Sequence, residues 1–312
     1  MKKIVFAIAI TILILLPLIS GCTGGDTTGT KGPITVGSKI DTEGSLLSQM
    51  IIIILRDNGF NTVDKSQFGP TSVVRKALIS GEIDIYPEYT GNGAFFFDEA
   101  DSPVWKSAQQ GFERVKELDQ AANNIIWLTP APANNTWAIA IPEDLAKKEN
   151  ITSLDDFAAY INTGGNVKLI GSEEFVSSPS ALPSFQDAYG FSLNKSQLLT
   201  VSSGDTAQTE KAAAEGTNGV NAAMAYGTDG SISAFGLVVL TDPKGVQPVY
   251  EPAPIIRSEV YDKYPEISTI LAPVFQSLDL ITLQTLNGKI AVEGQIAADV
   301  AMDYLEENGF LK

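Results

Sequence analysis

Three aromatic residues, Tyr89, Trp137 and Tyr226, lie at the ends of short stretches whose apolar patterns are typical of β-strands. An aromatic face can bind a quaternary ammonium in water, because this cation has a delocalised charge and no hydrogen-bond donor. Tyr86 lies three residues before Tyr89, across Pro87, and could simply pack in the core. Tyr226 could likewise be a packing residue. The first chemistry that the sequence offers is therefore the binding of a cation by aromatic rings.

Ser38 and Lys39 offer the complementary chemistry, the binding of a carboxylate. They follow an expected strand over residues 34–37 and directly precede an expected helix, a position at which backbone N–H groups favour an anion. A betaine carries both a quaternary ammonium and a carboxylate, and would need both kinds of group. Lys39 could equally be a surface lysine on a loop.

Four polar residues lie close to the aromatic residues in the sequence and could hydrogen-bond the same ligand: Thr90, Asn92, Asn135 and Thr228. Asn135 and Trp137 are two residues apart along an expected strand, so their side chains should point the same way. Asp229 could contact the ligand or cap the turn that follows Tyr226.

The composition excludes several other kinds of chemistry. The chain has 312 residues, no His and one Cys, which excludes a Ser-His-Asp or Cys-His mechanism, His metal ligands and a CxxC zinc or redox site. Its net charge of -16 opposes binding to nucleic acid or to an anionic membrane surface. We therefore expect no metal, no cofactor, no catalytic residue and no nucleic-acid partner. A hydrolase that uses two carboxylates stays as an alternative, although no pair of acids stands out.

The N-terminus predicts an export signal. Lys2 and Lys3 precede an apolar stretch over residues 4–19, and the only cysteine, Cys22, follows small residues at the position where a lipoprotein signal requires it. A transmembrane anchor with an incidental cysteine is the alternative. We expect a signal peptide over residues 1–22, lipidation of Cys22 and a flexible linker over residues 23–33. The protein would then be extracytoplasmic, held by lipid alone on the outer face of the cytoplasmic membrane, the periplasmic side if an outer membrane is present.

Strand and helix patterns alternate along the rest of the chain, which predicts an α/β fold with mostly parallel sheets. Strands are expected over residues 34–37, 83–86, 125–128, 136–141, 168–171, 198–202, 222–226 and 237–240. Helices are expected over residues 42–58, 70–78, 104–123, 154–161, 183–189 and 206–215, and from residue 259 onward. Breaks over residues 129–135 and 227–236 divide this pattern. They predict two α/β lobes joined by two hinge crossings, with residues 34–134 plus 238–312 in lobe 1 and residues 135–237 in lobe 2. A cleft between such lobes suits a small solute.

Several segments together resemble one family: ITVGSKIDTEGSLLSQM, GEIDIYPEYTGNG, NNTWAIAIP, AAMAYGTDGSISAFGLVVLTDPKGVQPVYEPAPIIR and LNGKIAVEG. The chain is similar to the substrate-binding proteins of ABC importers for glycine betaine, choline and related osmoprotectants, most of all to their osmotically inducible branch. The resemblance implies a bilobed type II periplasmic-binding-protein fold. It also implies that the protein captures a quaternary ammonium solute and delivers it to the permease subunits.

The resemblance also assigns roles to residues. Lys39 matches a lysine that contacts the ligand carboxylate, and Tyr89 matches a wall of the aromatic cage. Asn135 and Trp137 stand where relatives have an acidic residue and a tyrosine. Relatives carry an arginine near Ser178, which is absent here, and often a tyrosine where Glu210 stands; we expect Glu210 to be a solvated helix residue. These departures leave a different small cationic or zwitterionic solute as an alternative ligand.

Overall fold

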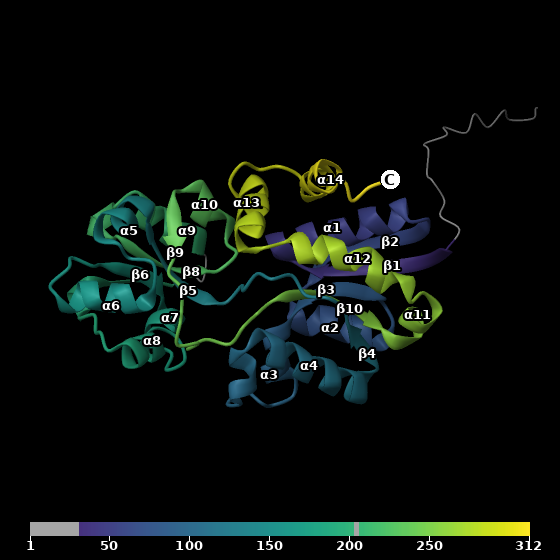
Figure 1. Cartoon of the computed structure of the whole chain (residues 1–312), viewed down its shortest axis with the longest axis horizontal. Coiled ribbons are helices and arrows are strands. Elements are labelled where there is room, and N and C mark those ends of the chain that lie inside the picture. The colour runs from purple at the N-terminus through teal and green to yellow at the C-terminus, as the bar shows by residue number, and fades with distance from the viewer. Residues whose placement is uncertain (1–30, 203–205) are drawn as a thin grey trace, which may run out of the picture.

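The computed structural model describes residues 31–202 and 206–312 (Figure 1). The expected signal peptide, the lipidation site Cys22 and most of the expected linker lie outside the described residues. The first strand, β1 (Lys31–Lys39), begins three residues earlier than expected, and Lys31 pairs in register with Phe60. The expectation that the linker extends to residue 33 is therefore wrong for its last three residues.

The first sheet has five strands in the order β2-β1-β3-β10-β4. Its other strands are β2 (Phe60–Gly69), β3 (Ile85–Tyr89), β4 (Ile125–Trp127) and β10 (Pro252–Arg257). β1 pairs in parallel with β2 and β3, whereas β10 lies antiparallel between β3 and β4. The sheet is therefore assembled from two distant segments of the chain.

The second sheet has the order β7-β6-β8-β5-β9. Its strands are β5 (Trp137–Pro142), β6 (Leu169–Ser172), β7 (Leu198–Val201), β8 (Ala222–Tyr226) and β9 (Leu237–Val239). β5 is antiparallel to β8 and β9, while β6 is parallel to β7 and β8. Both sheets are thus mixed, because one strand runs opposite to the others in each: β10 in the first sheet and β5 in the second. Each of these strands is the first to follow a crossing of the chain from the other sheet.

Helices cover both sheets (Figure 1). Those grouped with the first sheet are α1 (Thr42–Asp57), α2 (Thr71–Ser80), α3 (Gly93–Phe96), α4 (Ala108–Asn123), α11 (Ser258–Lys263), α12 (Glu266–Ser277) and α14 (Ala297–Glu307). Those grouped with the second are α5 (Glu143–Glu149), α6 (Leu154–Asn162), α7 (Glu173–Ser177), α8 (Leu182–Tyr189), α9 (Thr206–Ala214) and α10 (Gly230–Ala234). Short 3-10 helices occur at Thr90–Asn92, Pro103–Lys106, Lys195–Gln197 and Thr217–Gly219.

The start of α1 matters most for the site, and local chemistry fixes it. The Asp41 carboxylate accepts a hydrogen bond from the Gly44 N–H at 2.7 Å, which caps the helix. The apolar side chains of α1 are buried in a core with those of α12, α13 (Leu280–Ala291) and α14. A separate apolar core lies between the second sheet and its helices. The prediction of a two-part α/β fold is confirmed, although the sheets are mixed rather than nearly all parallel.

The chain crosses between the two sheets twice, and the two crossing segments lie side by side. The Asn135 N–H donates to the Tyr250 carbonyl at 2.9 Å, and the Tyr250 N–H donates to Asn134 Oδ1 at 2.8 Å. β9 pairs with β5, so residues 238–239 belong to the second sheet and their expected place in lobe 1 is wrong. The amide of Gln247 still donates to the Ser180 carbonyl at 2.7 Å. We therefore propose that lobe 2 extends to about residue 247, and that the second crossing begins there.

Helix α13 bridges the two halves, where we expected the C-terminal helices to belong to lobe 1 alone. It packs against α10 as well as α1. The Gln284 amide donates to the Gly227 carbonyl at 2.7 Å, and the Asn287 amide donates to the Thr228 carbonyl at 2.9 Å. A Cβ placed on Gly230 would lie 2.3 Å from the Gly288 nitrogen, so the two backbones meet without room for a side chain.

Within the described ranges, no single helix has both the length and the apolarity needed to cross a membrane. α12 and α13 reach those criteria only when taken together, and they are bent by 88° relative to each other.

Candidate functional site

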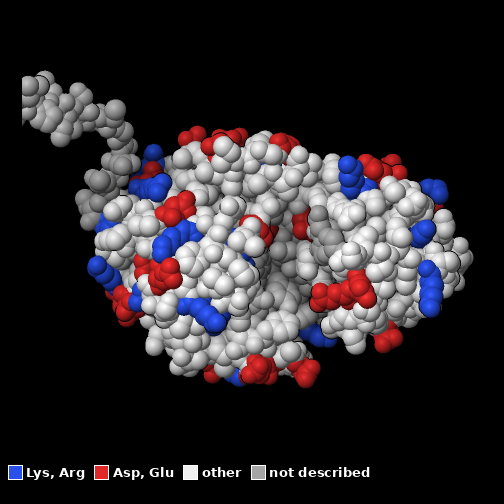
Figure 2. Space-filling view, turned by 180° about the vertical axis from the view of Figure 1, so that it is seen from behind, with Lys and Arg blue, Asp and Glu red and all other residues white. Residues whose placement is uncertain are grey.

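A cavity of about 910 Å³ opens between the two halves, and Figure 2 shows the hollow with acidic residues beside it. Both halves, both crossings and α13 contribute to its walls. Seven of the nine residues expected at the ligand line it: Lys39, Asn92, Tyr89, Asn135, Trp137, Tyr226 and Thr228. The fold therefore brings seven of the predicted residues together around one cavity.

One wall is aromatic. Trp137 and Tyr226 are directly paired residues of the antiparallel strands β5 and β8, so their side chains share one face of the sheet. Their rings are stacked, with centroids 6.5 Å apart and planes inclined by 25°. Phe175, in the middle of α7, makes a T-shaped contact with Trp137, with ring centroids 6.2 Å apart. Tyr250 also lines the cavity from the second crossing. It does not stand out in the sequence, because no strand pattern surrounds it.

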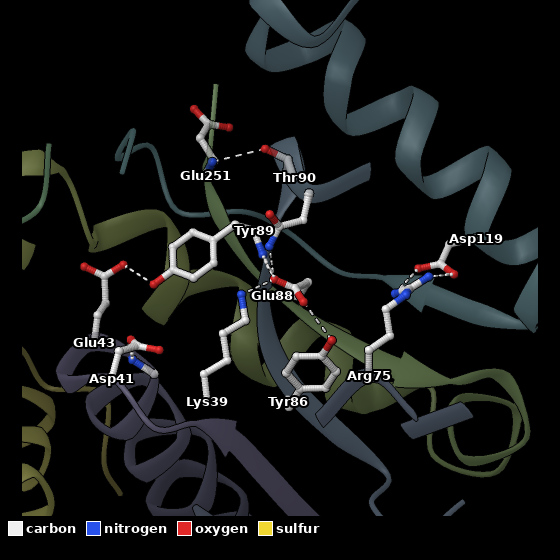
Figure 3. A network of polar contacts seen from close by, with 12 residues as sticks. Lys39, Asp41, Glu43, Arg75, Tyr86, Glu88, Tyr89, Thr90, Asp119 and Glu251 are labelled. Carbon is white, nitrogen blue, oxygen red and sulfur yellow. Dashed lines mark hydrogen bonds and ion pairs between the residues drawn. The ribbon is translucent and has the colours of Figure 1, made fainter. Parts of the chain in front are cut away.

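On the opposite wall, Glu88 holds several side chains in place (Figure 3). This fully buried carboxylate accepts hydrogen bonds from the Tyr86 hydroxyl at 2.8 Å and from the Asn92 amide at 2.8 Å, and it forms an ion pair with Lys39. The Lys39 ammonium also lies 4.5 Å from the centroid of the Tyr89 ring. The Lys39 ammonium is therefore paired with Glu88 and lies beside the Tyr89 ring at the cavity wall, and its contact with a ligand carboxylate stays a prediction. Tyr86 is buried in the core, which agrees with the packing role that the sequence left open for it.

Glu43, in the first turn of α1, is a second buried carboxylate and also lines the cavity. Oε1 accepts from the Tyr89 hydroxyl at 2.7 Å, and Oε2 accepts from the Asn287 amide at 2.7 Å. Burial raises the pKa of Glu43 to about 7, although hydrogen bonds from Thr228, Tyr89 and Asn287 act in the opposite direction. Glu43 cannot be recognised as a site residue from the sequence, because an acidic residue in the first turn of a helix is ordinary.

The charges that line the cavity are mostly negative. Five carboxylates line it: Asp41, Glu43, Asp101, Glu174 and Asp229. Lys39 is the one basic residue among the described lining residues. Asp229 accepts a hydrogen bond from the Tyr226 N–H at 2.7 Å, which fits its expected alternative role as a turn cap. The field of such a cavity favours a positively charged group.

Three side-chain oxygens in the lining lack a hydrogen-bond partner within residues 31–202 and 206–312. They are Oδ1 of Asn135, Oγ1 of Thr136 and Oδ1 of Asn287, and all three atoms are buried. Buried acceptors normally have partners, so such atoms in a cavity wall point to a ligand with positively polarised groups.

Ser38 and Thr90 are not among the residues that line the cavity, and their contact with the ligand stays a prediction. The Ser38 hydroxyl donates to the Lys39 carbonyl at 2.8 Å and accepts from the Gln67 N–H at 2.7 Å. The Thr90 hydroxyl donates to the Val249 carbonyl at 3.1 Å and accepts from the Glu251 N–H at 3.1 Å. Both hydroxyls are used to fix backbone segments that surround the site.

Two further expectations can be compared with the structure. Ser178 lines the cavity, and no arginine is among the described lining residues, in agreement with the departure noted in the sequence. Glu210 is fully buried on α9, so its expected solvation is wrong. No group of three or more His, Cys, Asp or Glu residues could hold a metal ion in the part of the chain that the structure describes.

Comparison with known proteins agrees with this geometry. Residues 32–307 match the family described as the substrate-binding domain of ABC-type glycine betaine transport systems. The glycine betaine-binding protein YehZ of Escherichia coli K12 is 57% identical over 280 residues, which cover 90% of this chain and 92% of that protein. A glycine betaine-binding protein of Pseudomonas aeruginosa is 31% identical and covers 89% of this chain and 88% of its own.

Solved structures give the same result for the fold. The apo structure of Escherichia coli YehZ superposes with a TM-score of 0.86 and covers 90% of this chain and all of that one. The crystal structure of a glycine betaine/carnitine/choline ABC transporter protein is 19% identical, yet its TM-score is 0.80, with 91% of this chain and all of that chain covered. The bilobed type II periplasmic-binding fold is thereby confirmed. Substrate-binding proteins of ABC importers act outside the cytoplasm, together with permease components. The chain belongs to the family of substrate-binding domains of ABC-type glycine betaine transport systems.

Proposed function

We propose that this chain binds a quaternary ammonium solute, with glycine betaine as the first candidate, and delivers it to the permease subunits of an ABC importer. One observation carries the choice of ligand: the cavity combines stacked aromatic rings with five carboxylates and a single lysine that is already paired. Such a lining attracts a cation and offers it the ring faces that it needs. Two relatives with glycine betaine-binding names support the same ligand.

The proposed ligand site consists of the seven predicted residues that line the cavity, together with Glu43 and Tyr250. Trp137 and Tyr226 would contact the ammonium methyl groups. Asn135 would present its unpartnered oxygen to them. The proposed role is binding without turnover, so the solute should leave the protein chemically unchanged.

A second candidate is a cation that has no carboxylate, such as choline. The ion pair between Lys39 and Glu88 favours it, because Lys39 is the one basic residue of the described lining and a ligand carboxylate would compete for it with a buried acid. For glycine betaine, neutral donors would then have to hold the carboxylate.

Calorimetric titration with glycine betaine, choline, carnitine, proline betaine and putrescine tests the proposal. We expect binding of at least one quaternary ammonium, and mass spectrometry should recover that solute unchanged after incubation. The ratio of glycine betaine to choline affinity decides between the two candidates. Binding of uncharged solutes alone, or conversion of the ligand, would contradict the proposed function.

We also propose that the exported chain is anchored by lipid at Cys22, on the sequence pattern of residues 1–22 alone. In cells, the wild-type chain should take up radioactive palmitate and fractionate with membranes. The Cys22→Ala variant should lose the label. A labelled Cys22→Ala variant would contradict the lipid anchor.

A further inference from the structure

Glu43 occupies an unusual place for an acidic side chain. It lies in the first turn of α1 and is only 4% exposed, yet it reaches the cavity surface. Most buried carboxylates are paired with a basic residue, as Glu88 is with Lys39. Within the two described ranges, no Lys or Arg forms an ion pair with Glu43. Its charge is therefore not compensated by a basic residue of the described chain.

Neutral donors from three other parts of the fold hold the carboxylate in position. They are the Tyr89 hydroxyl from β3, the Asn287 amide from α13, and the Thr228 hydroxyl from the turn after β8. A carboxylate has about four lone-pair positions, so these three bonds orient it and leave it able to accept a further contact. Glu43 and its three donors all line the cavity, and Figure 3 shows the contact between Glu43 and the Tyr89 hydroxyl.

A second buried group points to the same place. Asn287 is 4% exposed, its amide nitrogen donates to Glu43, and its Oδ1 has no hydrogen-bond partner among the described residues. A carboxylate and an unpartnered amide oxygen therefore lie next to each other at the cavity wall. One carries a negative charge and the other a partial negative charge, so together they attract the positively charged end of a ligand.

We propose that Glu43 is a specificity-determining residue of this cavity, and that its carboxylate supplies the negative charge that faces the cationic group of the ligand. The inference rests on the proposed function, because it needs a cationic ligand. It goes further in naming one side chain that distinguishes a quaternary ammonium from an uncharged group of the same shape.

The protonation of Glu43 provides a way to observe this role. Burial raises the pKa of Glu43 to about 7, and a cation bound beside it would lower that pKa again. Ligand binding should therefore release a proton near neutral pH, and affinity should rise as Glu43 ionises. If only the ionised form binds the cation, the affinity at pH 8 exceeds that at pH 6 by about ten-fold, since the ionised fraction rises from about a tenth to about nine tenths.

Two titratable groups act directly on Glu43: Tyr89 from β3 and Asp41 from the start of α1. Lys39 from β1 and Asp229 from the turn after β8 line the same cavity. α13 presents the uncharged Asn287. Burial raises the pKa of Tyr89 well above its ordinary value, so Tyr89 stays protonated. The chain contains no histidine, the side chain that would otherwise be expected to titrate between pH 6 and 8.

The test compares glycine betaine with 3,3-dimethylbutanoate, in which a carbon atom replaces the charged nitrogen. Titration calorimetry of the full chain at pH 6 and pH 8, in buffers with different heats of ionisation, gives the affinities and the protons released. For the wild type we expect the ten-fold rise with pH and proton release on binding glycine betaine. The Glu43→Gln variant should bind glycine betaine at least ten-fold more weakly at pH 8, without pH dependence or proton release. Its affinity for 3,3-dimethylbutanoate should not fall.

Two variants serve as controls. Glu174→Gln removes the same charge from an exposed residue of the cavity lining and should keep the pH dependence. Glu43→Asp keeps the charge and should restore proton release. If Glu43→Gln lost affinity equally for both ligands, Glu43 would have a purely structural role and the inference would be overturned. An unchanged ratio of the affinities for glycine betaine and 3,3-dimethylbutanoate would overturn it as well. A wild-type chain that binds no quaternary ammonium at either pH would overturn the proposed function itself, and with it the inference.

Discussion

At the scale of single residues, Trp137 and Tyr226 owe their contact to strand pairing, since each is the direct partner of the other across β5 and β8. The alternating pattern in NNTWAIAIP and the apolar run before Tyr226 are enough to predict both strand ends. The sequence could therefore place these rings at one site before any contact was known.

The stacked rings give the first prediction. Replacing Trp137 by Ala should weaken binding of a quaternary ammonium by about 1–2 kcal/mol, the value of a desolvated cation–π contact. Trp137→Phe keeps a ring and should lose less. Titration calorimetry of both variants, with thermal unfolding as a check on the fold, measures the effect. Unchanged affinity in Trp137→Ala would mean that the ligand does not contact this wall.

Glu43 and Glu88 could not be predicted as site residues. An acid near a helix start or within a strand motif has many ordinary explanations, and neither position signals burial. Only the tertiary structure shows that Glu88 forms an ion pair with Lys39 and accepts a hydrogen bond from the Tyr86 hydroxyl. The same holds for the hydrogen bond that Glu43 accepts from the Tyr89 hydroxyl. The ion pair between Lys39 and Glu88 could not be predicted for the same reason.

The raised pKa of Glu43 also predicts how stability depends on pH. The folded state holds this proton more tightly than the unfolded state, so the stabilising contribution is complete below about pH 4.5 and is lost as pH rises through about 7. Relative to the wild type without ligand, Glu43→Gln should therefore gain on the order of 3 kcal/mol of unfolding free energy between pH 4.5 and pH 8. Urea unfolding across this range measures the difference. A difference that does not vary with pH would show that Glu43 titrates normally.

At the scale of elements, the sequence predicted most helices and strands but missed β2 and β10. β10 contains Pro252 and Pro254, which cannot donate to a sheet and normally argue against an internal strand. It is tolerated here because Pro254 lies opposite Pro87 of β3, while the carbonyls of both β10 prolines accept hydrogen bonds from the Leu128 and Ala131 N–H groups. β2 is an edge strand with many polar residues, so its alternation is weak.

The contact between α10 and α13 gives a prediction at this scale. In Gly230→Ala the new methyl group would lie 2.3 Å from the Gly288 nitrogen, so the two backbones must separate, and we expect a loss of about 2 kcal/mol or more. Gly111→Ala is the matched control, because its methyl group meets nothing closer than 3.6 Å inside α4 and should stabilise the helix by about 0.5–1 kcal/mol. Urea unfolding separates the two outcomes. Equal effects would contradict the close approach of α13.

At the scale of the whole molecule, the cavity volume of about 910 Å³ is large for a solute as small as glycine betaine. Aromatic rings and carboxylates act strongly on a cation only when water is excluded. The two crossings that join the halves are the natural hinge, and closure would bring the aromatic wall toward Glu43.

Ligand binding should therefore make the molecule more compact. We expect small-angle X-ray scattering to show a smaller radius of gyration at saturating glycine betaine than without ligand. The Trp137→Ala variant, at a ligand concentration too low to saturate it, should change less. A constant radius of gyration in a protein that calorimetry shows to be saturated would contradict closure.

A nascent chain that reaches only residue 251 cannot complete its first sheet, because β4 joins β3 solely through β10. Until residues 252–257 arrive, β3 keeps an open edge, which is a template for pairing with other chains. The strands of the second sheet are contiguous between Trp137 and Val239 and need no later residues. We therefore expect the second half to fold before the first, and premature termination between Val239 and Pro252 to yield aggregation-prone products.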